Sequence, residues 1–486
     1  MLPDLPVEIL CTIVNCLPTA SILRLRQVSK HLNQITYDRT IWAHAYRTSS
    51  LVRREGPFTW QTAKVLEANL IESTKLSLNW APNPDAKPVQ TQVINLDKHT
   101  ESELLCGRWL LSRKNSTQIS CYDLDQAAEP MAKEPYSIFY ECRERDFEIT
   151  DHSCEHPLLS ERSGDEDHAA AFFLVTEFHA VISLLRRTLY KVTLTQGSYP
   201  TLHMVFQTDH TAAYPIRSEL FVGPRFLAIS FYGTEYFPRD TVFVDIVTYQ
   251  QYHVPESASD TTKDICFFTI ISSSTHVLFI QGYGPRFGDT VTHIQAYIIP
   301  PLQGTAPAAL ASMTLELSHE LITETDLSSY VLLRDSKLHQ PSGAIHITIF
   351  AADKGSEEHK FAVYVVFVKL NPIVQGVGSI TLETNVNDLN RFMGRELSDV
   401  RLQPSLNGCT RGALVYLDNE TSCIAALVVD DENAANTRAA VGYVQCSRDH
   451  EEDVWIYIRA FDGYRGRIIT TQEICGENSL IVDDFV

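Results

Sequence analysis

Residues 5–35 read LPVEILCTIVNCLPTASILRLRQVSKHLNQI, and this stretch sets the organisation of the N-terminal part of the chain. Leu5, Ile9, Ile13 and Leu17 recur every four residues, which predicts an apolar stripe along one helix. Pro6 suits the first turn of that helix, where its missing N–H costs nothing. A helical cluster this small buries little of its own surface. We therefore expect the stripe to meet another protein or the rest of the chain.

Cap residues predict three further short helices. Pro18 ends the first helix, and Thr19 or Ser21 is expected to cap a second one. Ser29 is expected to cap a third helix and Asp38 a fourth, whose residues Ile41, Trp42, Ala45 and Tyr46 fall on one face.

These residues together resemble a known family. The run Leu5-Pro6-x-Glu8-Ile9-Leu10, followed by Ile13, Leu17-Pro18, Leu23, Leu25, Val28-Ser29-Lys30 and Ile41-Trp42, is similar to the F-box, through which substrate receptors join cullin-based ubiquitin ligases. The resemblance covers about residues 3 to 47. It departs at Leu32, where the family often has Trp, and this departure is expected to weaken adaptor binding without abolishing it.

The resemblance implies a partner and a contact surface. The partner is a ligase adaptor protein and, through it, a cullin in an SCF-type complex. The implied adaptor-binding residues are Leu5, Pro6, Ile9, Leu10, Ile13, Leu17, Leu23, Val28 and Leu32.

The amino-acid composition limits which other classes of partner the chain is expected to bind. The chain has 486 residues with 40 Lys and Arg against 60 Asp and Glu, a net charge of −20 that disfavours nucleic acids and anionic membrane surfaces. The longest apolar run, residues 361–368, is far shorter than the roughly 20 residues that cross a bilayer. The N-terminus lacks the basic start of a secretory signal, and the 11 cysteines are scattered and odd in number. We expect an intracellular protein, cytoplasmic or nuclear, with reduced thiols.

A connector follows the helical cluster. Thr59 is expected to cap a helix from Trp60, and Pro82, Pro84 and Pro88 end it. A helix ending in an Asn-Trp such as Asn79-Trp80 is similar to that of F-box proteins from mushroom-forming fungi. The predicted regions are 1–47, the F-box; 48–100, the connector and linker; and 101–486, a large all-β domain.

From about residue 105 the apolar period changes from 3.6 to 2, which indicates half-buried strands. Seven two-strand units are expected, and they begin near Arg108, His179, Arg225, His276, Gly343, Gly412 and Asp453. Repeated hairpins at irregular spacing favour a β-propeller of about seven blades, with six or eight also possible. A pair of β-sandwiches is the alternative.

An acidic stretch lies between residues 125 and 168, with 13 acidic residues against four basic ones. Because it shows little strand pattern, we expect a long exposed insertion. Asp165, Glu166 and Asp167 are the candidate site for a basic target protein, and the alternative is a solvated acidic loop without a binding role.

Motifs for catalysis or metal binding are missing from the sequence. Cys142 and Cys154 are too far apart in sequence for a zinc knuckle, although His152 and His156 lie near them. There is no Gly-x-x-x-x-Gly-Lys-Ser/Thr phosphate loop and no Gly-x-Ser-x-Gly nucleophile elbow. The sequence therefore predicts a noncatalytic substrate receptor without cofactor or metal. The alternative is an adaptor-bound scaffold that acts outside ubiquitination, and a propeller hydrolase has no motif in its favour.

Overall fold

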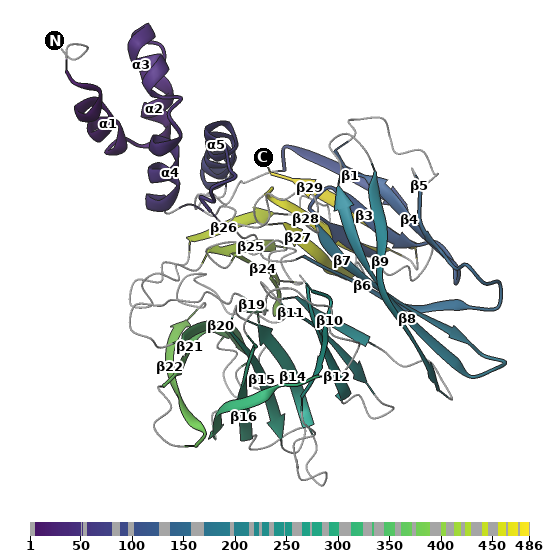
Figure 1. Cartoon of the computed structure of the whole chain (residues 1–486). Helices are drawn as coiled ribbons and strands as arrows, with labels where there is room; N and C mark the ends of the chain where they lie inside the picture. Colours follow the sequence, from purple (N-terminus) through teal and green to yellow (C-terminus); the bar gives the residue numbers. More distant parts are fainter. Residues whose placement is uncertain are drawn as a thin grey trace.

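A computed structural model of the chain gives a small helical N-terminal region followed by a large all-β domain, as the sequence predicted (Figure 1). The structure describes residues 5–49, 51, 56–79, 88–95, 102–125, 137–156, 170–194, 199–212, 218–222, 226–232, 238–246, 248–254, 265–272, 275–283, 291–300, 313–323, 333–334, 345–354, 361–371, 376–388, 400–404, 413–418, 423–428, 440–445, 455–462, 465–474 and 477–485.

The helices are α1 (Val7–Asn15), α2 (Thr19–Leu25), α3 (Lys30–Ile35), α4 (Arg39–Thr48) and α5 (Ala63–Asn79). Two predicted caps are confirmed, since Ser29 accepts a hydrogen bond from the Leu32 N–H and Asp38 from the Thr40 N–H. The cap predicted for the second helix is wrong: Pro18 occupies the cap position, and Thr19 is already helical. The fifth helix starts three residues later than predicted, after Thr62, whose hydroxyl accepts from the Val65 N–H.

The helices share one hydrophobic core, and α5 belongs to it. Trp42 and Tyr46 of α4 are fully buried, and Leu66 and Leu70 of α5 pack against the same cluster. The Trp42 indole N–H donates to the Thr36 carbonyl oxygen at 2.7 Å, which satisfies the polar atom of a buried ring. The connector helix is therefore part of the helical cluster.

Within the described residues, the strands of the β domain form six sheets, which divide by antiparallel pairing into seven four-stranded units. The first three are β2 (Ser102–Leu105), β3 (Trp109–Arg113), β4 (Gln118–Asp123) and β5 (Ser137–Glu141); β6 (Glu148–Glu155), β7 (Ala171–His179), β8 (Leu184–Leu194) and β9 (Pro200–Thr211); and β10 (Ser218–Val222), β11 (Phe226–Tyr232), β12 (Pro238–Asp245) and β13 (Gln251–His253). The short β17 (Met313–Thr314) pairs in parallel with β13.

The fourth unit is β14 (Ile265–Ser272), β15 (His276–Tyr283), β16 (Val291–Ile298) and β18 (Glu316–Thr323), and the fifth is β19 (Leu333–Arg334), β20 (Ile345–Lys354), β21 (Phe361–Leu370) and β22 (Gly378–Asp388). The sixth is β23 (Val400–Pro404), β24 (Ala413–Asp418), β25 (Cys423–Val428) and β26 (Ala440–Gln445). The seventh is β27 (Trp455–Asp462), β28 (Arg467–Ile474), β29 (Glu477–Asp484) and the early strand β1 (Gln90–Asn95). A short parallel pairing of β18 with β22 joins the fourth and fifth units into one eight-stranded sheet.

Successive units pack against one another. First strands are in contact between units: β2 with β6, β6 with β10, β10 with β14, β19 with β23, β23 with β27, and β27 with β2. Hydrophobic clusters fill the spaces between sheets, as where Trp109 and Leu111 of the first unit meet Phe173 and Val175 of the second.

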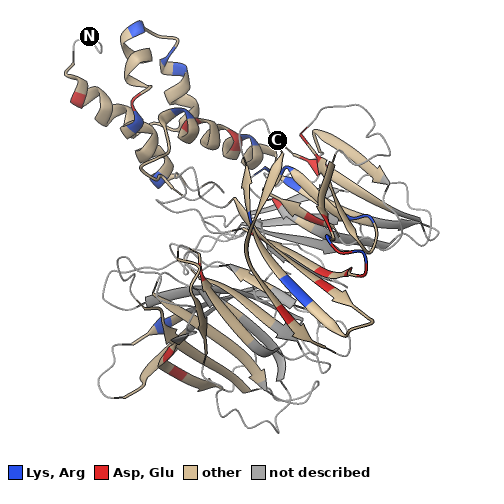
Figure 2. Ribbon diagram, turned by 45° about the vertical axis from the view of Figure 1, so that its right-hand side comes forward, with Lys and Arg blue, Asp and Glu red and all other residues tan. Residues whose placement is uncertain are grey.

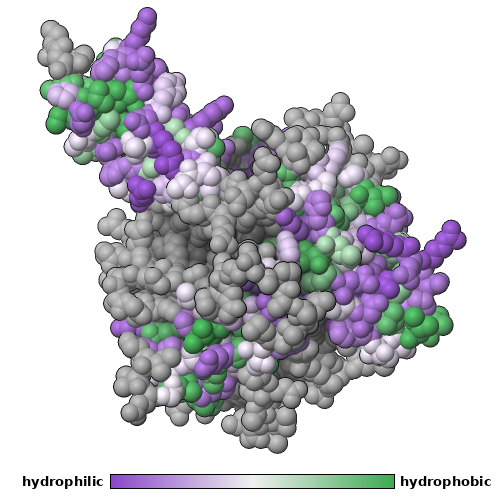
Figure 3. Space-filling view, in the orientation of Figure 1, coloured by the Kyte–Doolittle hydropathy of each residue, from purple (hydrophilic) through white to green (hydrophobic). Residues whose placement is uncertain are grey.

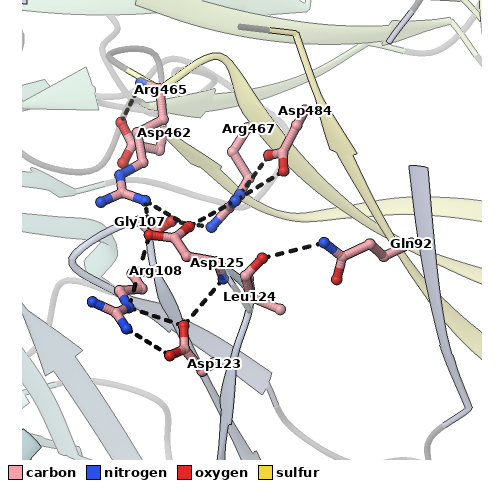
Figure 4. Close-up of polar contacts among 10 residues, drawn as sticks. All are labelled: Gln92, Gly107, Arg108, Asp123, Leu124, Asp125, Asp462, Arg465, Arg467 and Asp484. Atoms are coloured by element: carbon pink, nitrogen blue, oxygen red, sulfur yellow. Dashed lines mark hydrogen bonds and ion pairs between the residues drawn. The ribbon is translucent and has the colours of Figure 1, made fainter. Parts of the chain in front are cut away.

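The beginning and the end of the β domain are joined by strand pairing and by side-chain contacts. β1 pairs antiparallel with β29, Gln90 opposite Asp484, so a strand from the beginning of the β domain completes the last sheet. Beside it, Arg467 donates to the Gly107 carbonyl oxygen and forms ion pairs with Asp484 and Asp125 (Figure 4). Because β1 belongs to the last sheet, the β domain begins near residue 90, earlier than the predicted 101.

The expected long insertion at residues 125–168 is wrong for residues 137–156, the part of it that the structure describes as strands and a turn. β5 and β6 lie inside this stretch, and Ile149, His152 and Cys154 of β6 are buried. Pairing with β7 and burial on alternate positions hold β6 in place, although its sequence, EITDHSCE, is acidic. Some of the charged residues of this stretch therefore lie on strands β5 and β6.

Candidate adaptor-binding surface

α1 carries hydrophobic side chains on two of its sides. Leu10 and Val14 point into the helical core and are buried. Val7 and Ile9 are each 49% exposed, and Leu5 and Ile13 are each 37% exposed. Figure 3 shows hydrophobic surface at the end of the helical cluster near the N-terminus. We call Leu5, Ile9 and Ile13, which recur every four residues, the α1 face; Val7, at the first position of α1, is exposed on another side of the helix.

The structure separates the residues that the sequence grouped together. Leu10 and Leu32 are buried within the cluster, so they shape the α1 face from beneath and present no area to a partner. Leu17 and Leu23 are partly buried against the same core. Pro6 is exposed beside the α1 face, and Val28, which follows α2, is exposed. Val7 was missed because it lies outside the four-residue repeat, and only the folded helix reveals its exposure.

Arg26 fixes the helices behind this surface. Its guanidinium donates two hydrogen bonds to the Glu67 carboxylate of α5 and one each to the hydroxyl and carbonyl oxygens of Thr36. It also stacks over the Tyr37 ring, with 4.2 Å between Cζ and the ring centroid. Hydrogen bonding to Glu67 raises the pKa of Arg26, which stays charged. α5 is thus tied to the cluster by a bidentate ion pair as well as by its hydrophobic side chains.

α5 also connects the helical cluster to the β domain. Asn79, the last residue of α5, donates its side-chain amide to the Phe485 carbonyl oxygen at 2.7 Å. Phe485 follows β29 and is buried. The cluster is therefore attached where β29 ends and β1 begins, and the α1 face is carried at its outer end (Figure 1).

Comparison with known proteins assigns this region. A family model described as F-box-like matches residues 2–48. This region is an F-box-like domain. The match covers α1 to α4, which bear the α1 face and most of the core beneath it. The prediction from the sequence motif is confirmed for these residues.

Other comparisons add little to the F-box assignment. A search of curated protein sequences gave no match. Solved structures that resemble the chain include an α-L-arabinanase from Penicillium chrysogenum complexed with arabinobiose, at 10% identity and a TM-score of 0.31 over 82% of this chain and 98% of that one. Another is the hemagglutinin-neuraminidase ectodomain of parainfluenza virus 5, at 9% identity and a TM-score of 0.31 over 86% and 95%. At these values the similarity supports no statement about the activity of this chain.

The candidate target residues Asp165, Glu166 and Asp167 lie outside the described residues. In Figure 2 the described acidic and basic residues are interspersed along strands and helices. The described part of the chain contains no helix long and apolar enough to cross a membrane.

The structure places the four potential metal ligands, Cys142, His152, Cys154 and His156, in the β domain without grouping them around a common point. His152 and Cys154 are buried in β6, and burial lowers the pKa of His152 to about 4, with a smaller effect from Arg113. The His156 ring accepts a hydrogen bond from the Cys106 backbone N–H at 2.7 Å. Among the residues that the structure describes, no group of three or more His, Cys, Asp or Glu side chains is placed to hold a metal ion.

Proposed function

We propose that this chain is the substrate-recognition subunit of a cullin-based, SCF-type ubiquitin ligase. The F-box-like domain binds the ligase adaptor and thereby the cullin, and the β domain binds the target protein. The chain is a noncatalytic, intracellular receptor in this proposal, and the transfer of ubiquitin belongs to other subunits.

The α1 face is the observation that carries the proposal. The core of the helical cluster is already filled by buried side chains such as Trp42, Tyr46 and Leu66, so the exposed apolar side chains on α1 are surplus to folding. Three such side chains, Leu5 just before α1 and Ile9 and Ile13 within it, form a hydrophobic patch, and patches of this kind mark protein-binding sites. Full burial of a side chain of this size contributes roughly 1.5 to 3 kcal/mol, and these side chains are 37–49% exposed, so a partner that covers them gains roughly 0.5 to 1.5 kcal/mol from each.

We further infer that the β domain is a seven-bladed β-propeller. Support comes from the four-stranded units, from the contacts between their first strands, and from the completion of the last sheet by β1. Radial repetition of this kind leaves only short, protected sheet edges, and a pair of β-sandwiches would not bring the first strands of successive units together.

The runner-up is an adaptor-bound scaffold that acts outside ubiquitination. It shares the α1 face and the adaptor with the main proposal and differs only in the presence of the cullin. Composition of the purified complex therefore separates the two.

The test is co-purification of the full chain with adaptor and cullin from cells, followed by ubiquitin transfer in vitro. Recovery of both subunits supports the ligase proposal, and recovery of adaptor alone supports the scaffold. The double variant Ile9→Ala, Ile13→Ala should lose the adaptor. The matched control is Val65→Ala with Leu78→Ala, two exposed apolar residues of α5 that lie outside the F-box match. Equal adaptor recovery by both variants, or none by the unmodified chain, would remove the basis of the proposal.

A further inference from the structure

A buried histidine lies where the fourth and fifth units of the β domain are joined. Within the described residues, this is the one place where two units share a sheet. The joint is short, because β18 and β22 pair in parallel over two residues only, His319 opposite Gly378 and Glu320 opposite Ser379. Both are the last strands of their units, so side-chain contacts beside this pairing decide how firmly the two units hold together at their outer strands.

His319 hydrogen-bonds to both units. Its Nε2 lies 2.7 Å from the carbonyl oxygen of Asn371, which follows β21 and donates its own backbone N–H to the Ser379 carbonyl oxygen of β22. Its Nδ1 lies 2.9 Å from the Ser318 hydroxyl oxygen, and that hydroxyl donates to the Ala296 carbonyl oxygen of β16 at 2.9 Å. The imidazole ring therefore links the fifth unit to two strands of the fourth.

These three hydrogen bonds form together only when both ring nitrogens of His319 carry a hydrogen. The Asn371 carbonyl oxygen only accepts, so Nε2 must donate. Ser318 has a single hydroxyl hydrogen, and because the Ala296 carbonyl oxygen takes it, Nδ1 must donate to the hydroxyl oxygen. A ring with two N–H groups is the protonated, positively charged form. In the neutral form either Asn371 loses its donor, or the Ser318 hydroxyl turns to Nδ1 and leaves the Ala296 carbonyl oxygen.

Gly378 lets the ring approach this closely. It is buried opposite His319, and a Cβ atom at this position would overlap the imidazole ring. Any larger residue would displace the ring from its hydrogen-bonding partners. The pairing of β18 with β22 and the position of the ring are therefore linked.

The surroundings of His319 hold its charge only with neutral oxygen atoms. In the described part of the chain no carboxylate pairs with it. Glu320, the next residue on β18, extends to the other face of the sheet and pairs with His293 of β16 at 2.7 Å. The other charged residues on the described strands next to the ring are Glu316 of β18, which is exposed, Lys369 of β21, which is half-buried, and Glu383 and Asp388 farther along β22.

His276 of β15 is the titratable side chain that faces the ring. The two rings meet edge to face, with 5.9 Å between their centroids. Burial, and to a smaller extent the charge on His319, lower the pKa of His276 to about 4. His276 is therefore neutral near neutral pH and does not repel a charged His319 there. In stronger acid both rings carry a charge and repel each other.

We propose that His319 is a proton-dependent clasp: its protonated form holds the outer strands of the fourth and fifth units together, and loss of the proton loosens the joint between β18 and β22. Histidine suits this role because it is the side chain that ordinarily changes charge in the physiological pH range. The clasp involves no residue of the F-box-like domain, so the inference stands independently of the proposed receptor function.

The test is backbone amide hydrogen exchange of the full chain at about pH 6 and about pH 8, corrected for the intrinsic pH dependence of exchange. The segments that report on the joint are residues 318–320 and 378–381. Their protection should fall about threefold or more at the higher pH, as expected for the loss of one hydrogen bond. His319→Gln cannot change its charge, so its protection should be equal at both pH values. The matched control is His293→Gln, on the adjacent strand β16, which should keep the pH dependence.

Two further measurements do not depend on the folding of His319→Gln. Exchange of the imidazole C2 hydrogens, followed by mass spectrometry, reports the protonation of each histidine in the unmodified chain. It should show that His319 is charged at about pH 6 and neutral at about pH 8, with His276 neutral at both. Gly378→Ala should remove the protection of the two segments at both pH values. The inference is overturned if His319 is neutral throughout, if the protection of the unmodified chain does not change with pH, if Gly378→Ala leaves the joint protected, or if His293→Gln abolishes the pH dependence.

Discussion

Arg467 in the seventh unit of the β domain lies 3.0 Å from Asp125, which follows the third strand of the first unit. The same guanidinium donates to the Gly107 carbonyl oxygen at 2.6 Å and to both oxygens of Asp484. One buried cation thus joins the two ends of the β domain, with its charge balanced by two carboxylates (Figure 4).

Replacing Arg467 by Leu should lower the free energy of unfolding by about 3 to 5 kcal/mol, because the change leaves two carboxylates and a carbonyl oxygen without their shared donor. The measurement is urea unfolding of the full chain followed by tryptophan fluorescence. The matched control is Arg465→Leu. Arg465 also pairs with Asp125 but is more exposed, and its loss should cost only about 1 kcal/mol. Equal effects of the two variants would contradict a closing role for Arg467.

The same network predicts weakening in acid. Burial alone would raise the pKa of Asp125, but hydrogen bonds and ion pairs with Arg465 and Arg467 outweigh it and lower the pKa below its ordinary value. A carboxyl whose folded pKa is lowered stabilises the fold above its unfolded pKa, and this contribution disappears as the pH falls through the folded pKa. We expect Asp125→Asn to flatten the loss of stability below about pH 4. An unchanged acid transition would contradict this.

His152 predicts a second pH effect, in a higher range. Its folded pKa of about 4 lies below the ordinary value of 6.5, so the unfolded chain takes up the proton first as the pH falls. Stability should therefore decline between pH 7 and pH 5, by about 1 to 2 kcal/mol for this residue. The free energy of unfolding of His152→Gln, measured at both pH values, should fall less than that of the unmodified chain. A decline of equal size in both proteins would exclude His152 as its source.

Local sequence patterns predicted most of the fold. Helical spacing and cap residues such as Ser29 and Asp38 act over a few residues, and the helices formed nearly where they were expected. Each of the seven predicted two-strand units falls in a different four-stranded unit. β6 was missed because its burial depends on β7 and on the first unit, neither of which is visible in the acidic sequence EITDHSCE.

The candidate site was predicted only in part, for a related reason. Spacing identified an apolar helix but did not tell which part of its wide stripe faces the core. The structure turns Leu10 inward and leaves Ile9 outside, although both carry the same motif. Packing of α1 against α4 determines which side of α1 faces the core, and this packing cannot be predicted from the local sequence pattern.

The ion pair between Arg26 and Glu67 should contribute to the attachment of α5 to the helical cluster. Glu67→Gln keeps the shape of the side chain and removes the charge, and it should destabilise the helical cluster by about 1 to 3 kcal/mol. The readout is thermal unfolding followed by helical circular dichroism. Glu72→Gln is the control, because Glu72 lies on the same helix and makes no ion pair within the described part of the chain. A melting curve shifted equally by both changes would indicate a general effect of charge.

The contrast between Leu10 and Ile9 gives the sharpest test of the α1 face. Leu10→Ala removes a fully buried side chain and should destabilise the helical cluster by about 2 to 5 kcal/mol, with weaker adaptor binding as a consequence of unfolding. Ile9→Ala changes an exposed residue, so it should leave the free energy of unfolding within about 0.5 kcal/mol while lowering adaptor affinity at least about tenfold. Stability is measured by circular dichroism and affinity by calorimetry with purified adaptor.

Both measurements are needed because either variant alone gives an ambiguous loss of binding. Adding excess adaptor should restore the helical signal of Leu10→Ala by mass action, since the adaptor binds only the folded cluster. The same excess should stabilise Ile9→Ala by about 1.4 kcal/mol less than the unmodified chain when affinity falls tenfold, because that variant is folded but lacks contact area. If Ile9→Ala instead unfolds the cluster, or binds adaptor as tightly as the unmodified chain, then the adaptor contacts a surface other than the α1 face.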